Sequence, residues 1–268
     1  MNLFIYPLSA LFFFLSCVFV YATQDLEWSQ VKGQHFIVCY DNPAHRSVAD
    51  STLMRAEDSY NKVVARIGYA RYSQFWTWGD RVKIFLFSDH QAFLDQTRLP
   101  EWSRAGAFHA KDSDQRIIVS YSNQPRFFSE VLPHEIAHLV LKDFVGLNRA
   151  LPCWFSEGVA QLAEQDKVSK ADTIMRISAR LNAFFPFDIL ASYDVVNEKD
   201  EQRVALFYAQ SVSMVDFLIR RFGSEKFALW CRQIASGRGF DEAFRIAYGA
   251  HLQSLKSFEI KWLDSLRH

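Results

Sequence analysis

Two histidines and a glutamate within five consecutive residues are the feature of this sequence that could do chemistry. His134 and His138 are four residues apart, and Glu135 directly follows the first histidine. On a helix this spacing places both imidazoles on one face, one turn apart, and turns Glu135 about 100° away from them. Two neutral imidazoles so placed can bind one zinc ion, while the glutamate reaches a water at the open position of the ion. The stretch predicts a zinc site with His134 and His138 as ligands and Glu135 as general base.

The apolar surroundings of this motif weigh against a chance match. The segment 129–146 is otherwise rich in Leu, Ile, Val and Phe, and polar groups without partners are costly to bury. The alternative is an ordinary helix with two histidines at the edge of the core and a solvated glutamate. A bound metal ion would compensate for the burial, so we favour the zinc site.

A catalytic zinc ion needs a third protein ligand and an open fourth position. The segment 154–160, WFSEGVA, offers Glu157 at the start of a second predicted helix. Gly158 lacks a side chain where two helices must approach closely, and Trp154 and Phe155 are large enough to fix the register of this helix. Glu157 is therefore the candidate third ligand.

The HExxH motif, 18 intervening residues and a glutamate within WFxEGxA together resemble the gluzincin zinc metallopeptidases, and most closely the bacterial peptidase MA-like domains. The resemblance implies that His134, His138 and Glu157 hold one zinc ion. It also implies that Glu135 is the base and that a zinc-activated water hydrolyses a peptide bond of a peptide or protein substrate. The similarity extends over most of the chain after the first 22 residues.

The resemblance also implies an oxyanion-stabilising residue on a later helix, for which Tyr208 is the candidate. The alternative is that Tyr208 packs in the core, because it shares a helical stripe with apolar residues. Some gluzincins carry an acidic residue one turn after the third ligand, where this chain has Gln161. Glu164, about two turns after the ligand, is expected on a solvated face. The departure at Gln161 leaves open a second function, a non-catalytic gluzincin-like envelope module that binds zinc or a protein partner.

The first 22 residues contain no charged side chain, and residues 3–22 are almost wholly apolar. They predict a signal peptide that is cleaved after Ala22, followed by one metallopeptidase domain over 23–268. An uncleaved membrane anchor is the alternative, since about 20 apolar residues can span a bilayer, and a lipoprotein modified at Cys17 is a third. Each alternative predicts an exported protein, periplasmic, extracellular or tethered to a membrane outside the cytoplasm.

The composition and the order of elements set the fold class. Lys and Arg together number 30, as do Asp and Glu, so nothing favours a nucleic-acid partner. The four cysteines include no CxxC pair, which argues against a thiolate zinc site. Strands are expected at 35–40, 81–87, 105–110 and 116–121, helices at 43–68 and 88–97, and mainly helices from residue 129 onward. This order predicts an α+β fold with a small sheet on a mainly helical body. The resemblance implies the gluzincin type of this fold, with a mixed sheet and an antiparallel edge strand.

Overall fold

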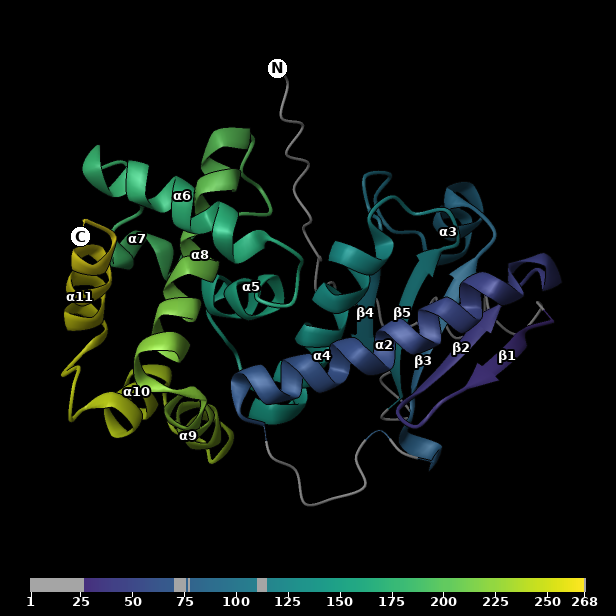
Figure 1. Cartoon of the computed structure of the whole chain (residues 1–268), viewed down its shortest axis with the longest axis horizontal. Coiled ribbons are helices and arrows are strands. Elements are labelled where there is room, and N and C mark those ends of the chain that lie inside the picture. Colours follow the sequence, from purple (N-terminus) through teal and green to yellow (C-terminus); the bar gives the residue numbers. More distant parts are fainter. Residues whose placement is uncertain (1–26, 70–75, 77, 110–114, 268) are drawn as a thin grey trace. The chain divides into compact units, whose positions relative to one another are not determined.

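The computed structural model describes residues 27–69, 76, 78–109 and 115–267, and the chain forms two compact units (Figure 1). Among the described residues, the sheet unit comprises 27–61 and 76–139. The helical unit comprises 62–69 and 140–267. The division falls inside two continuous helices, α2 (Arg46–Ile67) and α4 (Leu132–Val145).

The sheet unit contains five strands in the order β1-β2-β3-β5-β4. Their bounds are β1 Ser29–Lys32, β2 Phe36–Tyr40, β3 Val82–Phe87, β4 Gly106–His109 and β5 Arg116–Tyr121. Strands β2, β3 and β5 are parallel, whereas β1 and β4 pair antiparallel at the two edges. The expected small mixed sheet with an antiparallel edge strand is confirmed. Strand β1 was not predicted, because only Val31 of its four residues is buried.

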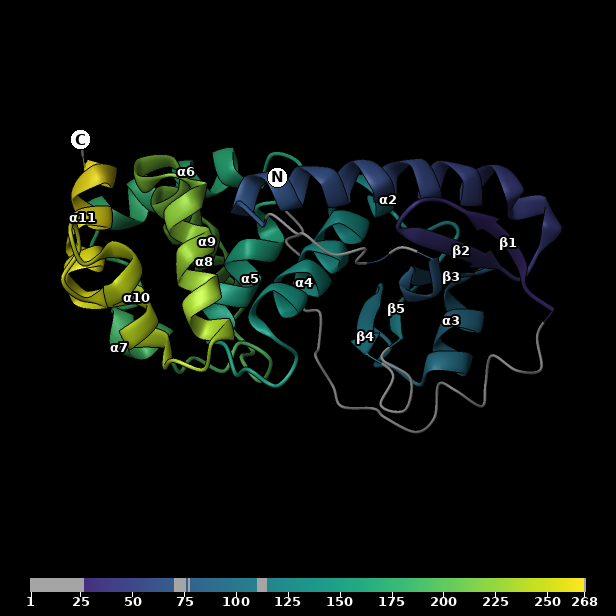
Figure 2. The same cartoon turned by 90° about the horizontal axis from the view of Figure 1, so that it is seen from below.

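Alternating side chains give the sheet two apolar faces. One face buries Cys39, Phe87 and Val119 against Phe93 of α3 (His90–Thr97). On the other face Phe36 packs edge-on against Tyr60 of α2. Figure 2 shows α2 and α3 on opposite sides of the sheet. Helix α3 begins directly after Asp89, whose side chain accepts a hydrogen bond from the Ala92 N–H and so caps the helix.

The helical unit is built around α8. Its helices are α5 Cys153–Gln161, α6 Lys167–Arg180, α7 Phe187–Leu190, α8 Glu201–Phe222, α9 Ser224–Ala235, α10 Phe240–Tyr248 and α11 Leu255–Arg267. Helix α8 packs against α5, α6 and α9, and the run Phe207–Ile219 is buried on all sides. The Asp200 side chain caps its start, and Gly223 with φ +88° ends it. A helix that is buried all round forms the core of its unit.

The small mixed sheet and the many helices confirm the α+β fold class. The predicted leader, residues 1–22, lies outside the described residues. The single domain expected over 23–268 also stays a prediction. None of the helices in the described ranges is both long and apolar enough to cross a bilayer.

Candidate metal centre

The HExxH segment lies on α4, whose apolar composition explains its burial. Residues 130–141 are all buried, as expected for a helix that is hydrophobic all round. Pro133 is the second residue of α4 and has no N–H to donate. Gly146, with φ +97°, ends the helix and donates its N–H to the Lys142 carbonyl at 2.8 Å. The sequence therefore fixes a rigid, buried helix under the two histidines.

A turn of π-helix, η3 (Phe127–Val131), leads directly into α4. The Leu132 N–H donates to the Phe127 carbonyl, and Arg126 before the turn has a left-handed backbone with φ +58°. Such π turns are uncommon and often lie beside functional sites. The sequence did not predict this turn, because FFSEV has the composition of an ordinary helix start.

Aromatic packing fixes the position of α5, which carries Glu157. The Trp154 ring lies 5.6 Å from the ring of Phe187 and 6.1 Å from that of Phe240. The Phe155 ring lies 4.6 Å from that of Trp230. These contacts hold the first turn of α5 in a single rotation, which sets the direction in which Glu157 leaves the helix.

Gly158 lies where α5 touches α8. A Cβ atom added to Gly158 would be 2.5 Å from the Ser211 carbonyl oxygen and 2.7 Å from a Val215 methyl group. No side chain fits in that space, so glycine is required for the close approach of the two helices. Because Gly158 directly follows Glu157, the same contact also helps to fix the position of Glu157. The apolar stripe of α8 was predicted, but its contact with Gly158 was not.

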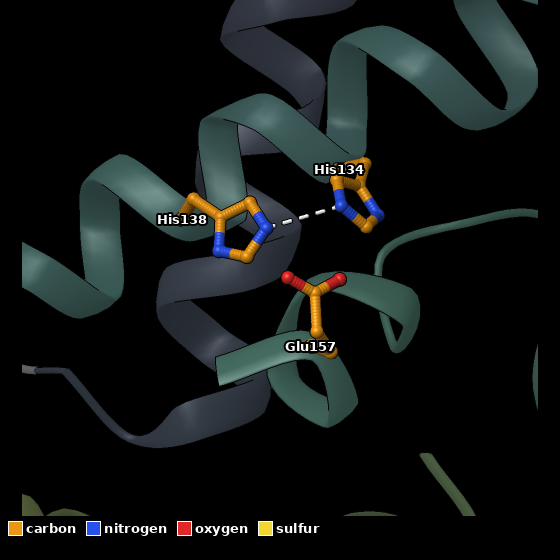
Figure 3. Close-up of side chains that lie close together, drawn as sticks. All are labelled: His134, His138 and Glu157. Atoms are coloured by element: carbon orange, nitrogen blue, oxygen red, sulfur yellow. Dashed lines mark hydrogen bonds between the residues drawn. The ribbon is translucent and has the colours of Figure 1, made fainter. Parts of the chain in front are cut away.

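The side chains of His134, His138 and Glu157 converge, as Figure 3 shows. The two Nε2 atoms are 3.1 Å apart, and the ring planes are inclined by 78°. One ligand atom from each residue lies within 4.8 Å of the others. The exposed fractions of the three residues are 0%, 1% and 5%.

The geometry and chemistry of these donors fit a zinc ion. Tetrahedral zinc with bonds of about 2.0–2.1 Å needs its ligand atoms roughly 3.3 Å apart. The two imidazole nitrogens, at 3.1 Å, are close to this separation, and a carboxylate oxygen of Glu157 lies within 4.8 Å of the histidine donors. Two histidines and a glutamate are also a common protein ligand set for catalytic zinc.

The other two candidate residues, Glu135 and Tyr208, are also buried. Glu135 lies on α4 next to His134 and is 2% exposed. Tyr208 lies on α8 and is also buried. Because Tyr208 is seven residues before Val215, both leave α8 in nearly the same direction, toward α5. This position suits a residue beside the metal group and also suits core packing, so the role of Tyr208 stays a prediction.

Glu164 differs from its predicted exposure. It is buried, and its carboxylate forms an ion pair with Lys167 at 3.2 Å. Helix α5 ends at Gln161, so Glu164 no longer follows the helical periodicity on which the prediction relied, and the chain turns its side chain inward. Gln161 is also buried. Both residues belong to the interior of the helical unit.

Cys153 begins α5 and is half-buried. Burial, together with the nearby Glu157 and Asp194 carboxylates, raises the pKa of its thiol to about 12. The thiol is therefore protonated at neutral pH. The donor atoms that converge within 4.8 Å of one another come from His134, His138 and Glu157, and this group does not include Cys153.

Comparison with known families gives one match. The family model of the peptidase MA superfamily matches residues 76–267, a range that includes both histidines, Glu135, Glu157 and Tyr208. A search of curated proteins finds no match.

Proposed function

Because this chain belongs to the peptidase MA superfamily, we propose that it is a zinc-dependent peptidase that hydrolyses peptide bonds in a peptide or protein substrate. The observation that carries the proposal is the buried group formed by His134, His138 and Glu157. Two imidazoles and a carboxylate whose donor atoms converge in a buried position are a ligand set that suits a divalent cation such as zinc.

His134, His138 and Glu157 would hold the zinc ion, which would supply a Lewis acid for the peptide carbonyl and lower the pKa of a water toward about 7. Glu135 would accept the proton of the attacking water and pass it to the leaving amine. Its position beside His134 on α4 keeps the carboxylate close to the ligands without using it as one. Its burial suits this role, because a general base in a dry site keeps its proton from bulk solvent.

Tyr208 would assist by donating a hydrogen bond to the oxygen that becomes negative as the carbonyl is attacked. The proposal is supported by its place on the α5-facing side of α8. The charge of the ligand set would also favour the negative charge that develops on this oxygen. Two neutral imidazoles and one carboxylate leave a divalent ion with a net positive charge, which stabilises a developing oxyanion.

The proposal is tested by measuring bound zinc and the cleavage of a broad peptide library. The native protein should bind zinc and cleave peptides. Glu135→Gln should retain the zinc but lose activity by about 10²-fold or more, because general-base catalysis contributes on that order. Glu242→Gln, the same substitution at an exposed residue of α10, serves as the control and should keep both properties.

Two outcomes contradict the proposal in different ways. Zinc bound without cleavage by the native protein favours the non-catalytic module that binds zinc or a protein partner. If the folded protein binds no zinc when zinc is supplied, the proposed metal centre is contradicted.

A further inference from the structure

A pocket of about 230 Å³ lies among α6, α8 and α11 of the helical unit. Phe217 and Trp262 form its apolar wall, and both side chains are buried. The indole N–H of Trp262 donates to the Ser213 hydroxyl at 3.0 Å. The indole is 0% exposed, so it packs behind the pocket wall, and Phe217, at 7%, is the aromatic ring that keeps some accessible surface.

Three arginines from two helices line the pocket. Arg176 comes from α6, and Arg220 and Arg221 come from the last turn of α8. Arg176 pairs with Asp172 at 2.8 Å, and Arg220 pairs with the buried Asp216. Arg176 and Arg220 are thus each paired with an aspartate, which leaves Arg221 as the lining arginine whose charge has no ion-pair partner among the described residues.

Arg221 is the most informative of the three arginines. Arg220 and Arg176 have structural partners, but Arg221 forms no ion pair with an acidic residue in the described part of the chain. The dipole of α8 favours a cation in its last turn, which accounts for Arg220 and Arg221. It does not account for Arg176, which approaches the same pocket from the body of α6.

The pocket is separate from the proposed metal centre. Helix α8 meets Gly158 of α5 through Ser211 and Val215. Phe217 is two residues beyond Val215, so it leaves α8 about 200° away around the axis. The pocket therefore lies on the side of α8 that faces away from α5, and the proposed peptidase mechanism uses none of its residues.

We infer that this pocket binds a small amphipathic anion. Its head is an oxyanion, carboxylate or phosphate, that is bound by Arg176, Arg220 and Arg221, and its apolar part packs on Phe217. The planar guanidinium group matches both oxyanions with paired hydrogen bonds. A pocket smaller than the usual 300–1,000 Å³ of drug-sized sites limits the ligand to a compact group, such as an aromatic amino acid with a free carboxylate or an aryl phosphate.

Three probes of similar size test the inference by isothermal titration calorimetry. They are N-acetylphenylalanine with a carboxylate, phenyl phosphate, and N-acetylphenylalaninamide, which is neutral. At least one anion should bind with a dissociation constant on the order of 1 mM, whereas the neutral amide should not bind detectably. The stronger of the two anions identifies the head group. Added NaCl should weaken the binding, because the arginines are partly exposed.

Arg221→Gln is the decisive variant, since removing this arginine disrupts no ion pair with another described residue. It should weaken binding of the anion roughly tenfold and leave thermal unfolding unchanged. Arg232→Gln, at an exposed arginine in the last turn of α9, removes the same charge outside the pocket and should bind as the native protein does.

The inference is overturned if neither anion binds, if the neutral amide binds equally well, or if Arg221→Gln binds the anion as tightly as the native protein. Binding should also be the same before and after treatment with a zinc chelator. The anion pocket and the peptidase proposal can therefore fail independently of each other.

Discussion

A single hydroxyl distinguishes the two roles considered for Tyr208. If it donates a hydrogen bond to the oxyanion, Tyr208→Phe should lower kcat by about 10²–10³-fold. KM should change little, because the hydrogen bond is made only in the transition state. If Tyr208 only packs in the core, the phenyl ring is sufficient and kcat stays at the native value. Peptide-cleavage kinetics, measured with bound zinc, separate these results.

Tyr248→Phe is the matched control for this experiment. Tyr248 is also a buried helical tyrosine, and its hydroxyl has no hydrogen-bond partner among the described residues. Removing that oxygen should leave activity unchanged and stability unchanged or slightly higher, because a buried hydroxyl without a partner is costly. Equal losses of activity in both variants would indicate a general effect on the fold.

His35 and Glu57 predict a pH dependence of stability in the sheet unit. The Glu57 carboxylate accepts the His35 backbone N–H at 2.8 Å and lies 2.6 Å from the His35 Nδ1 atom. Burial acts to raise the pKa of Glu57, but the hydrogen bonds from His35 outweigh it and hold that pKa below its ordinary value. A carboxyl with a lowered pKa in the folded state stabilises the fold above its unfolded pKa, about 4.3, and loses this effect as the pH falls further.

Glu57→Gln should therefore lower the free energy of unfolding at pH 7 by about 1 kcal/mol. The difference from the native protein should shrink as the pH falls from about 5 toward 3, where the native carboxyl is protonated as well. Urea unfolding followed by circular dichroism over this range measures the difference. A difference that stays constant with pH would show that the loss comes from packing instead of from the charge.

At the scale of helices, the contact of α5 with α8 predicts a strong effect of one methyl group. Gly158→Ala places a Cβ 2.5 Å from the Ser211 carbonyl oxygen, an atom of a buried helix backbone that cannot easily move. The helices must separate, which should cost about 1–3 kcal/mol of stability and displace Glu157. We expect a lower melting temperature together with weaker zinc binding, measured by calorimetry and by competition with a chelator.

Gly239→Ala provides the control, because a Cβ at Gly239 meets no atom within 4 Å and its φ of −61° suits alanine. It should change stability by less than about 0.5 kcal/mol. Native zinc affinity in Gly158→Ala would mean that the close approach of α5 and α8 does not position the ligand.

The elements that the sequence predicted are those whose pattern is local. HExxH lies within a single helix, so its spacing alone places His134 and His138 on one face. Glu157 requires the packing of a second helix, which spacing cannot supply, and its candidacy depended on the resemblance and on Gly158. Helix α6 was not predicted because Ile174 and Ile177, its two isoleucines, are exposed. Its buried residues are mostly small: Ala171, Met175 and Ala179.

At the scale of the whole chain, a bound metal ion should contribute to the stability of the fold. The candidate ligands lie on two helices, and 18 residues separate His138 from Glu157. The unfolded chain therefore lacks the assembled site, and zinc binds the folded state preferentially. At a free zinc concentration of 100 times the dissociation constant, this preference adds about 2.7 kcal/mol to the free energy of unfolding.

Removing zinc should therefore lower the melting temperature by roughly 5–10 °C for a chain of this length. Differential scanning calorimetry before and after chelation measures the shift, and restoring zinc should reverse it. Glu157→Gln should show a smaller shift, because one ligand is lost, whereas Glu242→Gln should respond as the native protein does. If chelation leaves the melting temperature of the native protein unchanged, or if Glu157→Gln shows the full native shift, then zinc is not held by the group on α4 and α5.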